Sequence, residues 1–138
     1  MKVAVIGDIH GTTKFLECYK NIQETDFDVE KIIVLGDWFD PYVDIDFDTM
    51  IERYNEFVKI WKSDDRIISI LGNHDLAGYI ISNDSTNRTL RFGKMRKQLR
   101  EVIEPNLPES YLTYKIGDYM FSHAGVSQDW LNDIGEIP

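Results

Sequence analysis

The chain has 138 residues, of which 43% are hydrophobic and 12% aromatic, which suffices for the core of one domain and exceeds what disordered proteins contain. Its net charge of -9 at pH 7 argues against a protein that coats nucleic acid or anionic membranes. A phosphorylated substrate remains compatible with this charge, because divalent metal ions can invert the local sign. We expect a single domain over residues 1–138.

The cysteine content and the apolar segments bear on the compartment. Cys18 is the single cysteine, which excludes an internal disulfide and suits a reducing environment. The apolar run after Lys2 is too short for a signal peptide, and no segment approaches the roughly 20 apolar residues that a membrane span needs. We therefore expect a soluble, cytoplasmic protein without a membrane partner.

The first half of the chain alternates short apolar runs with segments of helical periodicity. Such strand, helix, strand spacing is typical of βαβ units and predicts a parallel sheet in an α/β fold. The predicted elements, in order, are a strand at 2–6, a helix at about 13–23, a strand at 32–35, a helix at about 48–62 and a strand at 66–71.

The second half is less regular. We predict a loop over 76–87, a helix over about 89–103 that ends before Pro105, a β-hairpin from 111–116 and 118–122, and a short amphipathic segment at 129–134. The helix at 89–103 carries a cluster of basic residues in an otherwise acidic chain. Two interpretations stay open: a solvated helix face, which we favour, or a docking place for a phosphorylated or nucleic-acid substrate.

Polar side chains follow each of the three apolar strands, and each set is preceded by glycine. Because the carboxyl ends of parallel strands meet at one edge of an open α/β sheet, we expect these side chains to converge on one crevice. A further histidine ends the second strand of the hairpin, so all three histidines of the chain lie at strand ends. The side chains are Asp8 and His10, then Asp37 and Asp40, then Asn73 and His74, and finally His123.

These residue types indicate a site for divalent metal ions. A mixed set of oxygen and nitrogen ligands suits Mn²⁺, Fe or Zn²⁺ better than calcium or a metal bound by thiolates, and we expect Mn²⁺ first. One carboxylate can bridge two ions about 3.5–4 Å apart, and such a pair clamps the attacking and leaving oxygens of a displacement at phosphorus. A bridging hydroxide would be the nucleophile, so the chain needs no catalytic serine or cysteine.

Four short segments share this design. They are Gly7-Asp8-Ile9-His10-Gly11, Gly36-Asp37-Trp38-Phe39-Asp40, Gly72-Asn73-His74-Asp75 and Ser122-His123-Ala124-Gly125. In this order they resemble the first four signature blocks of the calcineurin-like metallophosphoesterases, and together they are highly specific. The resemblance implies a β-sandwich core with flanking helices and two metal ions. It places Asp8 and His10 on the first ion, Asp37 between the two, and Asn73 and His123 on the second.

The same resemblance implies the acid-base chemistry. His74 would be the general acid that protonates the leaving oxygen, and Asp40 would orient and charge it. The fourth block continues with Val126 and Ser127, which favours the branch that contains protein phosphatases and dinucleoside tetraphosphatases.

The chain departs from the family pattern at two places. Protein-phosphatase-like members carry Arg-Gly after the second block, where this chain has Pro41-Tyr42; Arg88 or Arg91 could supply the missing phosphate-binding charge. The chain also ends without the fifth Gly-His block. We therefore expect a C-terminally truncated or naturally short domain that lacks part of its second sheet, with an exposed edge that favours a homodimer.

Three functions remain open at this level. The first is hydrolysis of a phosphomonoester, whose substrate would be a phosphoprotein, a nucleotide or dinucleoside polyphosphate, or a nucleic-acid end. The second is a phosphodiesterase or nuclease of the same superfamily, which the second and third blocks favour and the acidic charge opposes. The third is a metal-binding or interaction module with little or no catalysis.

Overall fold

Three parallel strands form the central sheet in the computed structural model, which describes residues 1–80, 95–125 and 127, without the side chains of 77–80 and 96. The strands are β1 (Val3–Ile6), β2 (Lys31–Val34) and β3 (Ile67–Ser69), in the spatial order β1-β2-β3. Val3 pairs with Lys31, and Ile32 pairs with Ile67. The predicted parallel sheet is confirmed, and its strand ends share one edge.

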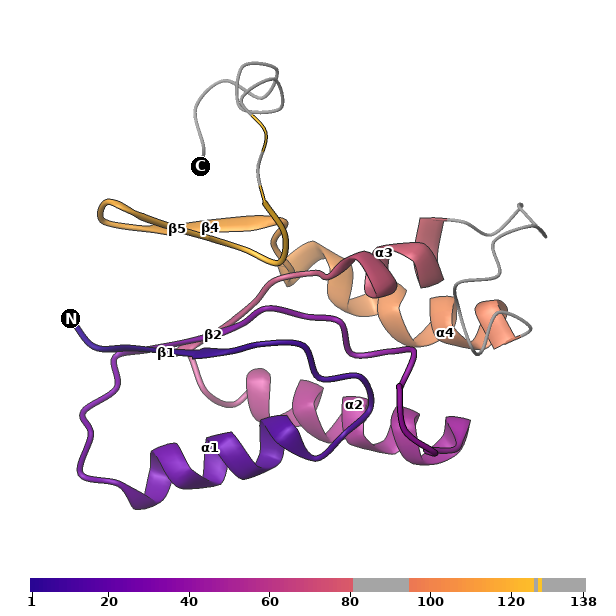
Figure 1. The fold of residues 1–138 in the computed structure, drawn as a ribbon, viewed down its shortest axis with the longest axis horizontal. Helices are drawn as coiled ribbons and strands as arrows, with labels where there is room; N and C mark the ends of the chain where they lie inside the picture. The colour runs from indigo at the N-terminus through magenta and orange to yellow at the C-terminus, as the bar shows by residue number, and fades with distance from the viewer. Residues whose placement is uncertain (81–94, 126, 128–138) are drawn as a thin grey trace.

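The sheet is covered on both faces. Helices α1 (Lys14–Glu24) and α2 (Phe47–Trp61) lie on one face, and the antiparallel hairpin of β4 (Thr113–Ile116) and β5 (Tyr119–Ser122) lies on the other (Figure 1). Alternation along β2 explains this, because Ile32 and Val34 belong to the apolar cluster under the helices while Ile33 belongs to the cluster under the hairpin. The result is the α/β layered core that the sequence predicts.

Aromatic side chains fill the layer between the sheet and the helices. The rings of Trp38 and Phe57 stack with centroids 4.1 Å apart, and Phe15 meets Phe57 edge to face at 4.9 Å. Helix α2 begins at a side-chain cap, since Asp46 accepts a hydrogen bond of 2.9 Å from the amide of Thr49. Trp38 directly follows Asp37, so this packing anchors the loop that bears the predicted bridging carboxylate.

The predicted loop over 76–87 is wrong in its first part. Helix α3 (Asn73–Ile80) starts directly after the loop that follows β3, and the amide of Leu76 donates to the carbonyl of Gly72 at 3.1 Å. The helix has only 8 residues and lacks a clear apolar period, so sequence pattern alone does not reveal it. Residues 81–87 lie outside the described residues.

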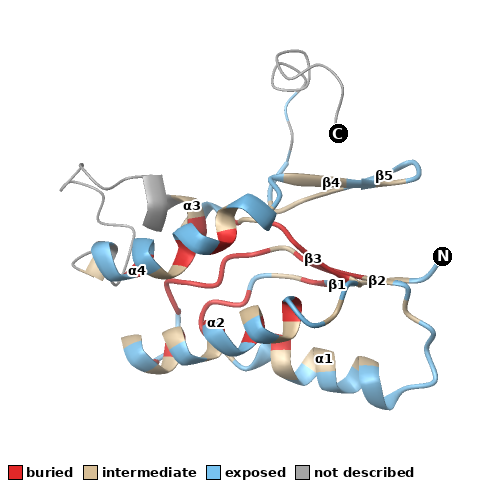
Figure 2. Ribbon diagram, turned by 180° about the vertical axis from the view of Figure 1, so that it is seen from behind, coloured by how far each residue is buried: buried red, intermediate tan, exposed pale blue. Residues whose placement is uncertain are grey.

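The remaining elements follow the predictions where the structure describes them. Helix α4 (Arg96–Ile103) confirms the end of the predicted helix at 89–103, and a 3₁₀ helix, η2 (Glu104–Glu109), follows it. Figure 2 shows that buried residues concentrate on the strands and on the inward sides of the helices. The predicted segment at 129–134 lies outside the described residues. Within the described ranges, none of the helices combines the length and the apolar character needed to cross a membrane.

Candidate metal centre

The five residues predicted as metal ligands meet at the carboxyl edge of the sheet. Asp8 and His10 lie in the loop after β1, Asp37 follows β2, Asn73 starts α3, and His123 follows β5. The hairpin covers the opposite face from α1 and α2, so His123 reaches the centre from a different layer than the other four residues (Figure 1). Convergence at this edge is the geometry that the strand pattern predicts.

Asp8, His10 and Asp37 form the first group. Ligand atoms of these three side chains all lie within 4.8 Å of one another. The Nδ1 atom of His10 lies 3.1 Å from the carbonyl oxygen of Phe39 and 3.0 Å from that of Asp40. A carbonyl oxygen can only accept, so Nδ1 carries the proton and the Nε2 lone pair faces Oδ2 of Asp37 at 3.7 Å. Such a backbone contact fixes the tautomer of a metal-binding histidine.

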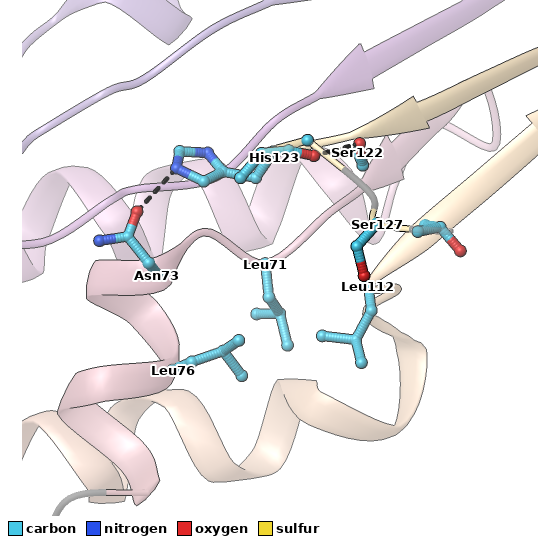
Figure 3. A pocket seen from close by; sticks show the side chains of 10 residues that line it. Leu71, Asn73, Leu76, Leu112, Ser122, His123 and Ser127 are labelled. Carbon is cyan, nitrogen blue, oxygen red and sulfur yellow. Dashed lines mark hydrogen bonds between the residues drawn. The ribbon is translucent and has the colours of Figure 1, made fainter. Parts of the chain in front are cut away.

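His123 is held in the same way on the other side of Asp37. Its Nδ1 donates to the carbonyl of Leu35 at 2.8 Å. Its Nε2 lies 2.9 Å from Oδ1 of Asn73 and 3.2 Å from Oδ2 of Asp37. The dashed line in Figure 3 marks the contact with Asn73. Oδ2 of Asp37 is therefore the common neighbour of His10 and His123, the position that a bridging carboxylate would occupy.

This donor set fits a divalent cation. Asp37 is 3% exposed and His10 is 6% exposed, so their polar atoms are withdrawn from water. Two histidine Nε2 atoms, an amide oxygen and a carboxylate oxygen, all able to accept, point at one another. Gathering acceptors around the buried His10 and Asp37 without a donor is costly, and a cation placed among them removes that cost. Asp8, whose side chain is 57% exposed, and Asn73 are exposed, and they leave the centre open to solvent.

Left-handed backbone conformations concentrate at the site. The non-glycine residues with positive φ in the described part of the chain are His10 (47°), Asp37 (52°) and Asp40 (65°). Each such residue costs about 1–3 kcal/mol, so the surrounding structure must hold it. Hydrogen bonds between the two loops do so: the amide of His10 donates to the carbonyl of Asp37 at 2.6 Å, and that of Gly11 to the carbonyl of Trp38 at 2.7 Å.

Asp75 links the loop after β2 to the loop after β3. Its fully buried carboxylate accepts hydrogen bonds from the amides of Asp37 at 2.8 Å, Trp38 at 2.8 Å and Gly72 at 2.9 Å. Burial raises the pKa of Asp75 to about 6, against the lowering effect of these donors. Sequence reasoning gave this residue no role, although an acidic side chain at the start of a helix is a recognisable signal.

Two glycines allow the close approach of these loops. A Cβ atom at Gly72 would overlap the carboxylate and the amide nitrogen of Asp37, and one at Gly36 would overlap the backbone of Gly72. Gly36 also has a φ of 84°, which side chains rarely adopt. At Gly36 and Gly72, glycine is thus required because a side chain would collide with the neighbouring loop, in addition to any need of the turn itself.

His74 and Asp40, the predicted acid and its partner, are adjacent to the centre. Nδ1 of His74 lies 2.9 Å from Oδ2 of Asp40, and the two side chains are 15% and 9% exposed. The amide of His74 donates to Oδ1 of Asp37 at 2.9 Å. The ring centroids of His74 and His10 are 5.3 Å apart, so the two residues face one reaction space.

A cavity of about 400 Å³ adjoins the His123 side of the centre. Figure 3 shows Asn73 and His123 at one end of it and three leucines, Leu71, Leu76 and Leu112, on the other side. The predicted phosphate-binding residues Arg88 and Arg91 lie outside the described residues. A basic residue that the structure places beside the centre, and that sequence reasoning missed, is Lys14, whose Nζ donates to the carbonyl of Asp8 at 2.8 Å.

Comparison with known proteins supplies the family. A sequence model described as calcineurin-like phosphoesterase matches residues 1–137. A comparison with curated proteins gave no match. The match spans all four sequence blocks, and the structure brings the side chains of these blocks to one edge of the sheet. The chain therefore belongs to the calcineurin-like phosphoesterase family.

Proposed function

We propose that this protein hydrolyses phosphate monoesters with the help of two divalent metal ions, with Mn²⁺ as the first candidate. Membership of the family and the group of Asp8, His10 and Asp37 support a metal-dependent phosphoesterase in general. The observation that carries the finer proposal is the position of Oδ2 of Asp37, 3.7 Å from Nε2 of His10 and 3.2 Å from Nε2 of His123. One carboxylate oxygen thus lies next to both groups of candidate metal ligands.

Each residue of the centre has a role in this proposal. Asp8 and His10 would hold the first ion, Asn73 and His123 the second, and Asp37 both. When bound, the ions would supply an activated water as the nucleophile and positive charge for the phosphate oxygens. The backbone contacts of His10 and His123 place the proton of each neutral ring on Nδ1 and aim Nε2 at this position.

His74 handles the leaving group in this proposal. Nδ1 would form an ion pair with the Asp40 carboxylate 2.9 Å away, which leaves Nε2 to donate to the leaving oxygen. As the bond between phosphorus and this oxygen breaks, the oxygen takes the proton from Nε2 and leaves as an alcohol. Water then returns a proton to the imidazole, and inorganic phosphate departs.

The test compares p-nitrophenyl phosphate with bis(p-nitrophenyl) phosphate, which release the same chromophore. We expect Mn²⁺-dependent hydrolysis of the monoester, its loss in excess EDTA, and its loss in Asp37→Asn. Asp26→Asn is the matched control, because Asp26 is exposed in the link between α1 and β2. A preference for the diester would favour a phosphodiesterase instead. Failure to hydrolyse either ester with Mn²⁺ would favour a metal-binding module.

A further inference from the structure

A second cavity, of about 270 Å³, lies beside the metal centre on the side of the first loop. It shares two residues, Asp8 and His10, with the candidate metal site, so a ligand in the cavity would touch the centre. Its other lining residues are Ile9, Thr12, Lys14, Tyr42 and Val43.

Tyr42 is the unusual residue of this cavity. Its side chain belongs to the exposed large hydrophobic residues, at 78% exposure, yet its ring lies 4.3 Å from the ring of His10 and 6.4 Å from that of His74, centroid to centroid. Val43 beside it is 54% exposed. An exposed aromatic ring next to a polar centre is a common element of ligand sites, because it offers a large contact area with little loss of conformational freedom.

The position of His74 indicates which part of a substrate would contact the ring of Tyr42. This step rests on the proposed function, in which His74 protonates the leaving oxygen. The leaving oxygen must then lie within hydrogen-bond reach of the His74 ring, and the group attached to it extends outward from there. The ring of Tyr42, edge-on to His74 at 6.4 Å, borders that space.

We propose that Tyr42 determines specificity by stacking against a planar aromatic leaving group, so that aryl or nucleoside monophosphates are better substrates than alkyl phosphates. Pro41 directly before it has a fixed φ, which restricts the backbone that presents the ring. Lys14, which also lines the cavity, donates a hydrogen bond to the carbonyl of Asp8.

The experiment measures kcat and KM for phenyl phosphate, adenosine 5′-monophosphate and ethyl phosphate with Mn²⁺. For Tyr42→Ala we expect KM to rise about 3- to 10-fold for the aromatic substrates, the range expected for a lost aromatic pair, and less than about 2-fold for ethyl phosphate. Tyr42→Phe keeps the ring and should keep the wild-type KM. Tyr119→Ala, which removes a tyrosine of similar exposure from β5, is the matched control. The aromatic substrate that loses more shows whether a small aryl group or a nucleobase is preferred.

Equal changes for ethyl and phenyl phosphate in Tyr42→Ala would overturn the inference while leaving the proposed phosphoesterase intact. A chain that turns over none of the three esters would instead contradict the proposed function. A binding measurement then tests the role of Tyr42 without turnover. Calorimetry of the Mn²⁺-loaded protein should show that phenylphosphonate binds more tightly than methylphosphonate, and Tyr42→Ala should remove this preference. The absence of that preference in the wild type would also overturn the inference.

Discussion

The Nδ1 atom of His74 lies 2.9 Å from Oδ2 of Asp40, while the amide of the same histidine donates to Oδ1 of Asp37 at 2.9 Å. Side chain and backbone of His74 are therefore held by two different carboxylates of the second block. Asp37 belongs to the candidate metal centre and Asp40 does not, so the arrangement couples the predicted proton donor to the centre without making it a ligand.

Replacing His74 by alanine should affect substrates according to their leaving group. We expect kcat for ethyl phosphate to fall about 10²- to 10⁴-fold, the usual contribution of a general acid, and kcat for p-nitrophenyl phosphate to fall far less, because nitrophenolate leaves without a proton. Asp40→Asn should produce the same pattern with smaller losses. Steady-state kinetics with both esters, alongside the metal content of each variant, checks this. Equal losses for the two esters, or loss of metal in His74→Ala, would contradict the assigned role.

Substitution of Gly72 should disturb the centre through contact alone. The added methyl of Gly72→Ala would overlap the carboxylate of Asp37, so we expect a loss of about 1–3 kcal/mol in the free energy of unfolding and weaker Mn²⁺ binding. Gly7→Ala is the matched control, because a Cβ there meets nothing within 4 Å. Urea unfolding and Mn²⁺ titration measure the two effects. Indistinguishable results for the two variants would show that the loops separate easily.

The buried carboxylate of Asp75 should contribute to the free energy of unfolding, although the sequence analysis assigns this residue no role. Asp75→Asn keeps the shape but turns an N–H group toward backbone amides that already donate, which leaves buried donors unsatisfied. We expect the free energy of unfolding to fall by about 1–3 kcal/mol. Urea unfolding of Asp75→Asn beside the exposed-site variant Asp26→Asn measures this. Equal stability of the two variants would mean that the three hydrogen bonds are dispensable.

The strands and the convergence of the site could be predicted from sequence because both depend on local pattern. Each apolar run that ends in glycine and a polar set became a strand end at one edge of the sheet, as the run before Asp37 illustrates. Helix α3 could not be predicted in this way, since its start is held by hydrogen bonds that Asp75 accepts from the amides of Asp37 and Trp38 in another loop. The place of Tyr42 beside His10 likewise depends on the path of the loop after Pro41, which no periodicity describes.

An ion pair far from the metal centre should govern part of the acid stability. Hydrogen bonds from the Arg66 guanidinium lower the pKa of Asp64 from an ordinary 3.8 to about 2, and Tyr19 donates to the same carboxylate at 2.9 Å. A folded pKa below the unfolded value means that this stabilisation is complete above about pH 4 and is lost as the pH falls toward 2.

Asp64→Asn should therefore lower the free energy of unfolding by up to about 2 kcal/mol at pH 7 and flatten its dependence on pH between 4 and 2. Chemical denaturation at several pH values measures this slope. Asp65→Asn is the matched control, because the neighbouring Asp65 is exposed. An acid limb that is the same in wild type and Asp64→Asn would contradict the assignment.

The most direct test of the proposed centre is the number of Mn²⁺ ions bound per chain, measured together with the hydrolysis of p-nitrophenyl phosphate on the same sample. We expect activity to rise with Mn²⁺ until about two ions are bound. Asp8→Asn should weaken one of these sites, and Asp37→Asn should weaken both and abolish turnover, because Oδ2 of Asp37 neighbours both His10 and His123. Undiminished Mn²⁺ binding in Asp37→Asn, or turnover that persists after metal is removed, would contradict a centre built around this carboxylate.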